Sequence, residues 1–196
     1  MPARIRAATE ADAAQIAAIY APVVATTAIS FEYEPPSAHD MAARVRGALE
    51  RYPWLVCERD GELLGYAYAT RHRERAAYQW SAESSAYIRA DARRRGVGRA
   101  LYGALLPMLA AQGLRSVYAG VTLPNPASVG LHEAIGFRPV GVFRHVGYKF
   151  GAWHDVGWWQ LALRGPEAPE PVRAFPQVVG TAEYLAAIEA GGRLLR

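Results

Sequence analysis

The sequence predicts an α/β (α+β) fold built as one compact domain. Apolar residues recur at helical spacing in some segments and form short strand-like runs in others, and the two kinds of segment alternate along the chain. The 196 residues are 52% hydrophobic, which suits a single domain that buries roughly 70% of its unfolded surface. No apolar run is long enough to cross a bilayer, and one cysteine excludes an intrachain disulfide. We therefore expect a cytoplasmic protein.

Two helices are expected near the amino terminus, after a short strand around Ile5. Each begins at a tetrapeptide that resembles a capping box, TEAD at Thr9–Asp12 and SAHD at Ser37–Asp40. The apolar residues that then recur at helical spacing are Ile16, Ile19, Tyr20 and Val23 in the first segment and Met41, Val45, Leu49 and Tyr52 in the second. Each segment therefore predicts an amphipathic helix.

A β-hairpin should follow in the run WLVCERDGELLGYAYA. Two strand-like segments flank Asp60–Gly61, and this dipeptide suits a tight turn because both residues accept positive φ. Cys57 lies in the first of these strands, next to Val56. A small core residue is the favoured interpretation of Cys57, ahead of a catalytic thiol.

The second half of the chain continues the alternation. SSAYI at Ser84–Ile88 predicts a strand, and a glycine turn after it leads into a further helix. The remaining expected elements are a strand at RSVYAGV, a helix over Ala127–Ile135, and strands near Val140–Tyr148 and Val156–Leu163.

After Arg164 the chain turns to the proline-rich stretch GPEAPEPVRAFP. Prolines cannot donate to a strand ladder, so this stretch should run over the surface as a strap. A weak helix is expected from Glu183 to Ala190. We therefore place one domain at residues 1–165 and treat residues 166–196 as a strap with a short helix, not a separate domain.

The charge of the chain leaves its partner class open. The net charge is +4 and the pI is near 9.4, which fits an anionic small ligand as well as a nucleic acid. A nucleic-acid module needs aromatic residues interleaved with a larger cationic face. Only Arg71–Arg75 and Arg93–Arg99 concentrate positive charge. We therefore rank nucleic-acid binding below the small anionic ligand, and we expect no membrane partner.

The segment DARRRGVGRALYGALL, Asp91 to Leu106, has the pattern of a phosphate-binding turn. A dinucleotide fingerprint lacks its third glycine here, and no Lys-Ser or Lys-Thr pair follows for a Walker loop. What remains is a turn with Arg93, Gly96 and Gly98 that opens a helix. The first amides of a helix and its dipole attract anions, and glycines let the backbone approach them. The turn should bind a pyrophosphate, the alternative being a solvated basic turn.

This turn resembles motif A of the GCN5-related N-acetyltransferases (GNAT), Arg/Gln-x-x-Gly-x-Gly/Ala, at Arg93, Gly96 and Gly98. The superfamily also has an asparagine near the start of the next helix and a Gly-Phe after it, which match Asn125 and AIGF at Ala134–Phe137. The chain is more specifically similar to the phosphinothricin N-acetyltransferase group in RYPWLV, AYQWSAESSAYI, LPNPASVGLHEAIGF and GYKFGAWHDVGWWQL. The resemblance spans about residues 4 to 178 and leaves residues 180–196 uninterpreted.

The resemblance implies the GNAT fold, a mixed twisted sheet of about seven strands flanked by about four helices, with acetyl-CoA as co-substrate. The backbone of the strand before the turn would run beside the acetyl-pantetheine arm, and the amides of the turn would hold the pyrophosphate. The implied cofactor contacts are Ala86, Tyr87, Ile88, Arg93, Arg94, Arg95, Gly96, Val97, Gly98, Arg99 and Asn125.

Acetylation of an amine needs a base, because a primary amine is mostly protonated near pH 7. Glu83, just before SSAYI, is similar to the proposed base of the family; the alternative is a solvated carboxylate at the end of a strand. For the leaving thiolate the superfamily often uses a tyrosine seven residues after the asparagine, where this chain has His132. His132 is therefore a candidate acid, with Tyr102 as a further donor and a purely structural histidine as the alternative.

The acceptor end is predicted from RHRERAAYQW, Arg71 to Trp80. Paired arginines suit carboxylate or phosphinate oxygens because guanidinium presents a planar fork, although an exposed charged loop is the ordinary alternative. The residues expected to contact the acceptor, partly through the resemblance, are Phe31, Arg73, Arg75, Tyr78, Glu83, Ser84 and Ser85. The expected acceptor is a glutamate-like amino acid, with a peptide N-terminus, an antibiotic amine or a polyamine as alternatives.

Two further expectations concern assembly and metals. Trp153, Trp158 and Trp159 offer more apolar area than a small domain needs, so a symmetric homodimer is expected. His145 and His154 have no metal-ligand spacing with a cysteine or a second ligand, so no metal site is inferred.

Overall fold

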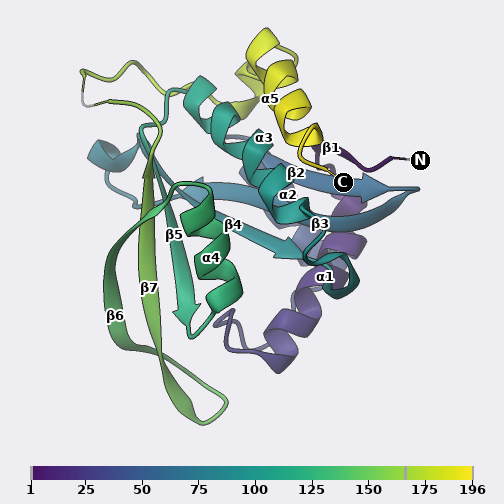
Figure 1. Ribbon diagram of the computed structural model, residues 1–196, viewed down its shortest axis with the longest axis vertical. Helices are drawn as coiled ribbons and strands as arrows, with labels where there is room; N and C mark the ends of the chain where they lie inside the picture. Colours follow the sequence, from purple (N-terminus) through teal and green to yellow (C-terminus); the bar gives the residue numbers. More distant parts are fainter. Residues whose placement is uncertain (1, 166, 196) are drawn as a thin grey trace.

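A single mixed sheet of seven strands forms the centre of the molecule (Figure 1). The structure is a computed structural model that describes residues 2–165 and 167–195. The strands lie in the order β1-β2-β3-β4-β5-β7-β6, and only the β4–β5 pair is parallel. Their bounds are β1 (Arg4–Ala7), β2 (Trp54–Arg59), β3 (Glu62–Arg71), β4 (Ser81–Ile88), β5 (Ser116–Leu123), β6 (Arg138–Lys149) and β7 (Ala152–Ala162). The predicted fold class is confirmed.

Five α-helices cover the sheet in the described part of the chain: α1 (Ala13–Thr26), α2 (Ala38–Leu49), α3 (Val97–Ala111), α4 (Pro126–Ala134) and α5 (Ala182–Gly192). Figure 1 shows α1 and α2 behind the sheet and α3 and α4 in front of it, with α5 beside α3. One core cluster, including Leu101 and Leu105 of α3, fills the space between α3 and the sheet. A second, including Ile16 and Val45, lies under α1 and α2.

Both predicted helix starts are confirmed as capping boxes. Thr9 and Asp12 cap a 3-10 turn (Glu10–Asp12) that leads into α1, and the Ser37 hydroxyl accepts a hydrogen bond of 3.1 Å from the Asp40 amide at the start of α2. The second helix ends at Leu49, so the expectation that Tyr52 continues its face was wrong. Pro53 disfavours helical geometry at Tyr52, whose side chain is nevertheless buried.

The hairpin and the interpretation of Cys57 are also confirmed. Asp60 and Gly61 both have positive φ, 52° and 83°, at the turn between β2 and β3. Cys57 is fully buried in β2, and this burial raises the pKa of its thiol to about 11. A protonated, inaccessible thiol is a packing residue.

The tryptophan prediction needs correction. All three residues lie on β7, and two of them do not offer free apolar area: Trp159 is buried and its indole donates to Glu133, whereas Trp158 is partly covered and packs on Phe143. Neighbouring residues of a strand face opposite sides of a sheet, so the pair covers both faces of β7. Of the three, only Trp153 is well exposed. It is part of an exposed apolar surface on the β6–β7 hairpin with Val140, Val142, Phe143, Val146, Tyr148 and Phe150.

No helix in the described ranges is long and apolar enough to cross a membrane.

Candidate active site

The sheet opens between β4 and β5. Their parallel pairing covers three residue pairs, from Ser81 with Ser116 to Glu83 with Tyr118, although each strand is eight residues long. Beyond Glu83 the two strands separate, so backbone groups of Ser84–Ile88 that point away from β3 have no partner strand. Such groups are obligatory hydrogen-bonding groups. The opening, which we call the fork, can therefore bind an extended ligand along β4.

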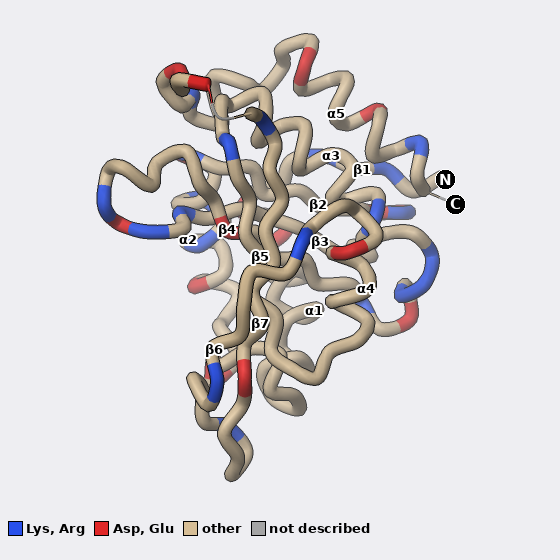
Figure 2. Tube along the Cα trace, turned by 60° about the vertical axis from the view of Figure 1, so that its left-hand side comes forward, with Lys and Arg blue, Asp and Glu red and all other residues tan. Residues whose placement is uncertain are grey.

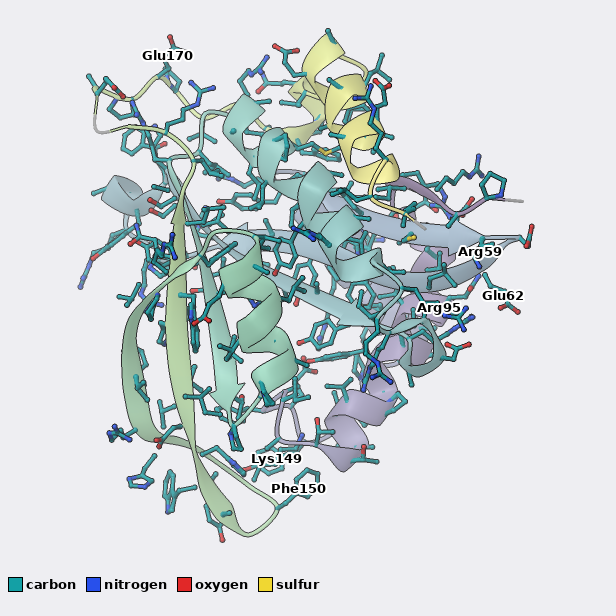
Figure 3. The ribbon with its side chains drawn as sticks, viewed as in Figure 1. Arg59, Glu62, Arg95, Lys149, Phe150 and Glu170 are labelled. Atoms are coloured by element: carbon teal, nitrogen blue, oxygen red, sulfur yellow. The ribbon has the colours of Figure 1, made fainter. Side chains whose placement is uncertain are left out.

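The basic glycine turn lies next to the fork. After β4 the chain makes a short 3-10 turn (Ala90–Ala92) and enters α3 through Gly96, whose φ is 84°. The first helical hydrogen bond joins the Ala100 amide to the Gly96 carbonyl, at 2.9 Å, which leaves the amides of Val97, Gly98 and Arg99 available. Three arginines, Arg93, Arg94 and Arg95, are exposed on this turn, which Figure 3 marks at Arg95. Available amides, a helix dipole and cations together fit a pyrophosphate.

Gly98 also has a packing role that the sequence did not indicate. The prediction that its missing side chain makes room for pyrophosphate stays a prediction. A Cβ on Gly98 would stand 3.1 Å from Leu131 of α4 and 3.8 Å from Ile88 of β4. The glycine therefore lets α3 approach α4 and β4 at the mouth of the fork, and its backbone amide remains the group available to a ligand.

Glu83 lies at the closed end of the fork, and His72 holds it there. His72 Nδ1 is 2.9 Å from Glu83 Oε1, and the imidazole stacks on Tyr118, the β5 residue paired with Glu83, at 4.3 Å between ring centroids. The Arg73 guanidinium is 3.7 Å from the same oxygen. The Glu83 side chain keeps 30% of its exposure, so this carboxylate is both oriented and accessible.

Sequence reasoning missed His72. It follows β3 directly, and its contacts come from β4 and β5, so no local motif marks it. A histidine just after the strand that pairs with β4 was the only available signal.

A hydrogen-bond chain crosses the sheet-facing side of α3. Ser84 Oγ lies 3.4 Å from the Tyr102 hydroxyl, which lies 2.9 Å from His132 Nε2. His132 Nδ1 lies 2.8 Å from the Ser128 carbonyl oxygen and must donate to it. Burial lowers the pKa of His132, against the opposing effect of that carbonyl, and burial raises the pKa of Tyr102 to about 12. Both groups are therefore neutral near pH 7, and His132 Nε2 accepts from Tyr102.

The residues predicted to contact the acceptor substrate lie in two places, the loop between β3 and β4 and the loop between α1 and α2. Arg73 is beside Glu83, whereas Arg75 begins a 3-10 turn (Ala76–Tyr78) and makes no ion pair or side-chain hydrogen bond with the described residues. Tyr78 is 43% exposed, its ring edge-on to His72 at 6.1 Å. Figure 2 shows that this loop and the turn before α3 both carry basic residues.

Phe31 lies apart from these arginines, in the loop between α1 and α2. Its ring fills the space over Gly147 of β6, where a Cβ would come within 2.1 Å, and lies 6.3 Å from the His154 ring of β7. The buried Lys149 ammonium, labelled in Figure 3, donates to the carbonyls of Val24 and Ser30 at 2.7 Å each. Lys149 therefore fixes the loop that carries Phe31 against the β6–β7 hairpin.

The remaining predicted residues lie around the fork. Ser85 and Ala86 pair with β3, and the Tyr87 ring packs on Tyr20 and Tyr66 behind the sheet, so Tyr87 has only its backbone to offer at the fork. The Asn125 side chain caps α4, accepting from the Ser128 amide at 3.2 Å.

A cavity that sequence reasoning did not predict lies on the same face as Glu83. Its volume is about 390 Å³, between α2 and strands β2 and β3, and its wall includes the stacked rings of Trp54 and Tyr68, 4.1 Å apart. Thr70 also lines it and pairs with Glu83 across β3 and β4. Paired residues of antiparallel strands share a face, so the cavity and the Glu83 carboxylate lie on one side of the sheet.

The family model of the GNAT acetyltransferase domain matches residues 5–158. A phosphinothricin N-acetyltransferase of Streptomyces viridochromogenes is 42% identical to this chain over 177 residues, 90% of this chain and 97% of that protein. An L-methionine sulfoximine/L-methionine sulfone acetyltransferase of Pseudomonas aeruginosa is 39% identical over 178 residues, 90% of this chain and all of that protein.

A solved structure of a GNAT superfamily protein is also similar to this chain. The crystal structure of a GNAT superfamily phosphinothricin acetyltransferase from Sinorhizobium meliloti, in complex with acetyl-CoA, superposes with a TM-score of 0.82. The two sequences are 35% identical, and the match covers 90% of this chain and 97% of the Sinorhizobium meliloti protein.

Proposed function

This chain belongs to the GNAT acetyltransferase family and is an acetyl-CoA-dependent enzyme, and we propose that its acceptor is the α-amine of a small glutamate-like amino acid. Phosphinothricin, methionine sulfoximine and methionine sulfone are the candidates, because relatives named for these compounds align with about nine-tenths of the chain. The observation that carries the proposal is the Glu83 carboxylate, held by His72 at the end of the fork and beside Arg73.

The fork and the α3 turn fit acetyl-CoA, which supplies the acetyl group as a thioester when bound. The amides of Val97, Gly98 and Arg99 would hold its pyrophosphate, with Arg93, Arg94 and Arg95 adding positive charge. The backbone of Ser84–Ile88 would hydrogen-bond to the pantetheine arm and orient it along β4. Both parts use groups that β5 and the helix leave unpaired.

Glu83 would act as the general base. An α-ammonium group must lose a proton before its nitrogen can attack a carbonyl. The Nδ1–H of His72 donates to Glu83 Oε1 and leaves Oε2 free for the acceptor's proton. His72 is thus a positioning residue for the base.

Tyr102 would donate a hydrogen bond toward the leaving sulfur. A phenol with a pKa of about 12 is a weaker acid than a thiol of about 8.5, so Tyr102 stabilises a thiolate without giving up its proton. The hydroxyl has a single hydrogen, which His132 Nε2 accepts in this structure, so the hydroxyl would have to turn from His132 toward the sulfur when acetyl-CoA binds. His132 then acts through Tyr102 rather than as the acid itself.

The acceptor's acidic end would bind at the loop between β3 and β4. Arg73 is already engaged near Glu83, whereas Arg75 is free to pair with a carboxylate or phosphinate. Tyr78, Ser84, Ser85 and, from the opposite side, Phe31 would enclose the rest of a small substrate.

The enzyme would be a homodimer joined through the exposed apolar surface of the β6–β7 hairpin. Strand β6 is an edge strand of the sheet, and Phe143, Tyr148, Phe150 and Trp153 are each about half exposed or more on this hairpin. Contiguous apolar surface on a sheet edge is costly in water and typical of an interface. Sedimentation at several protein concentrations would test this assembly.

A coenzyme A release assay over a panel of acceptors tests the proposed function. We expect phosphinothricin, methionine sulfoximine and methionine sulfone to be turned over well, and their decarboxylated analogues poorly, because the analogues keep the amine but lose a group that the arginines hold. Preference for a peptide N-terminus, an antibiotic amine or a polyamine would overturn the proposed acceptor and leave the acetyltransferase assignment intact.

A further inference from the structure

Helix α5 packs on α3 with two glycines at the contact. It lies beyond residues 5–158, which the family model matches, and Figure 1 shows it beside α3, where it also contacts β1. Gly191 Cα is 3.5 Å from the position that a Cβ on Gly103 would take. A Cβ on Gly191 would come within 2.6 Å of the Ala100 carbonyl oxygen and 2.8 Å of Ala104 Cβ. The two helix backbones are therefore as close as glycine allows.

The residues just after α5 extend this contact to the glycine turn. The Leu194 carbonyl oxygen lies 3.0 Å from the Cβ position of Gly96, the residue through which the chain enters α3. The Leu194 side chain lies over Gly103, where a Cβ would come within 2.7 Å of it. Leu194 thus touches both the turn and the second turn of the helix.

The strap holds the other end of α3. The Arg173 amide donates to the Gln112 carbonyl at 2.8 Å, and the Gln112 side-chain amide donates back to the Arg173 carbonyl at the same distance. The Arg173 guanidinium also donates to the Ala111 carbonyl. The C-terminal segment is therefore attached to α3 near both of its ends.

We propose that α5 and Leu194 are a positioning element for acetyl-CoA: they set where the first turn of α3 presents its amides. The proposal rests on the placement of the pyrophosphate at this turn. Hydrogen bonds to an anion depend steeply on geometry. Gly96, whose φ is positive, has no side chain whose packing could fix the position of its backbone. Contacts from α5 supply that support from outside the family domain.

Adjacent glycines provide a matched test. Gly191→Ala places a methyl group against Ala100 and Ala104, whereas a Cβ on Gly192 meets nothing within 4 Å, so Gly192→Ala is the control. We expect Gly191→Ala to raise the Kd of coenzyme A, measured by calorimetric titration, about 5-fold or more. The KM for acetyl-CoA should rise with it, while the KM for the acceptor and kcat at saturating acetyl-CoA stay near those of the control.

Leu194 gives a second variant that does not threaten the core, because this side chain is 40% exposed. Leu194→Ala should also weaken coenzyme A binding. Leu194→Met keeps an apolar contact over Gly103, so its coenzyme A affinity should stay near that of the unmodified enzyme. If Gly191→Ala fails to fold, the two Leu194 variants decide. Coenzyme A affinities equal to that of Gly192→Ala in every folded variant would overturn the proposal.

Arg93→Ala separates this proposal from the placement of the pyrophosphate. If Arg93→Ala weakens coenzyme A binding and the α5 variants do not, α5 is only a packing element and the cofactor site stands. If neither Arg93→Ala nor the α5 variants weaken binding, the turn is not the pyrophosphate site, and the role of α5 is overturned with it.

Discussion

The two edges of β4 differ in how they are paired. Toward β3, the strand is paired from Ala82 to Ile88. Toward β5, it is paired only from Ser81 to Glu83. The closed edge borders stacked aromatic rings, including Tyr66 and Tyr68 of β3, whereas the open edge borders the α3 turn and the proposed reacting groups. One strand thus holds the sheet together on one side and leaves backbone groups free for a ligand on the other.

This difference predicts which variants change chemistry and which change stability. Substitutions at the fork should alter rate or affinity and leave unfolding nearly unchanged. Substitutions on the β1–β3 side should do the reverse. Four variants test the division, from the largest expected effect to the smallest.

Glu83→Gln should cause the largest loss. Removing a general base costs roughly 10²- to 10⁴-fold in rate, and the free energy of unfolding should stay near that of the unmodified enzyme. The loss should shrink at high pH, where more of the amine is already deprotonated. Steady-state rates between pH 6 and 10 provide the measurement, and a near-native rate at pH 7 would remove Glu83 from the mechanism.

Leu55→Ala should have the opposite profile. Leu55 is fully buried in β2, and truncation of such a side chain costs about 2–5 kcal/mol of stability because it leaves a cavity. Urea unfolding measures that loss. The KM values for both substrates should be unchanged at temperatures where the variant is folded; a large change in KM for acetyl-CoA would show that the two edges of β4 are coupled.

Arg75→Ala should raise the KM for phosphinothricin or methionine sulfone about 10- to 150-fold, the equivalent of one charge-assisted hydrogen bond of roughly 1.5–3 kcal/mol. Coenzyme A affinity should not change, because Arg75 lies on the loop between β3 and β4 and away from α3. Arg59→Ala, at the end of β2 by the β2–β3 turn, is a control for loss of one positive charge. Better turnover of polyamines by Arg75→Ala would mean that the loop does not bind an acidic acceptor.

Glu58→Gln should have the smallest effect, about 1 kcal/mol of stability. Hydrogen bonds from Arg6 and Arg4 lower the pKa of Glu58, against an opposing effect of burial. A carboxyl group with a lowered folded-state pKa stabilises the protein above its ordinary pKa, about 4.3, and loses that contribution as the pH falls through the folded-state value. The stability difference between the two proteins should therefore begin to narrow as the pH falls below about 4.3 and disappear only below the folded-state pKa. A difference that does not narrow on acidification would exclude this ion pair as its source.

Features of the fold with local causes were predictable from sequence. Ser37 and Asp40 are three residues apart and cap the same helix, and Asp60–Gly61 needs only its own φ angles to form a turn. The resemblance supplied the positions of the glycine turn and of Glu83, and the structure places both at the fork; their roles in binding and catalysis stay predictions. A helix was expected over Glu183–Ala190, and α5 spans Ala182–Gly192.

What sequence could not supply were contacts between distant residues. His72 meets Glu83 only because β3 and β5 place both residues at the same end of β4. The contact of Gly103 with Gly191 and Leu194 follows from a packing that no local pattern encodes. The burial of Trp159 similarly depends on α4, which covers one face of β7.

The short contact between β4 and β5 also governs how the molecule comes apart. Three residue pairs join β1–β4 to β5–β7–β6 within the sheet, so local opening should start there and expose the fork amides to hydrogen exchange and the chain to proteases. A ligand that bridges the fork suppresses opening by mass action. Protection of the fork amides against hydrogen exchange should therefore rise with the concentration of acetyl-CoA.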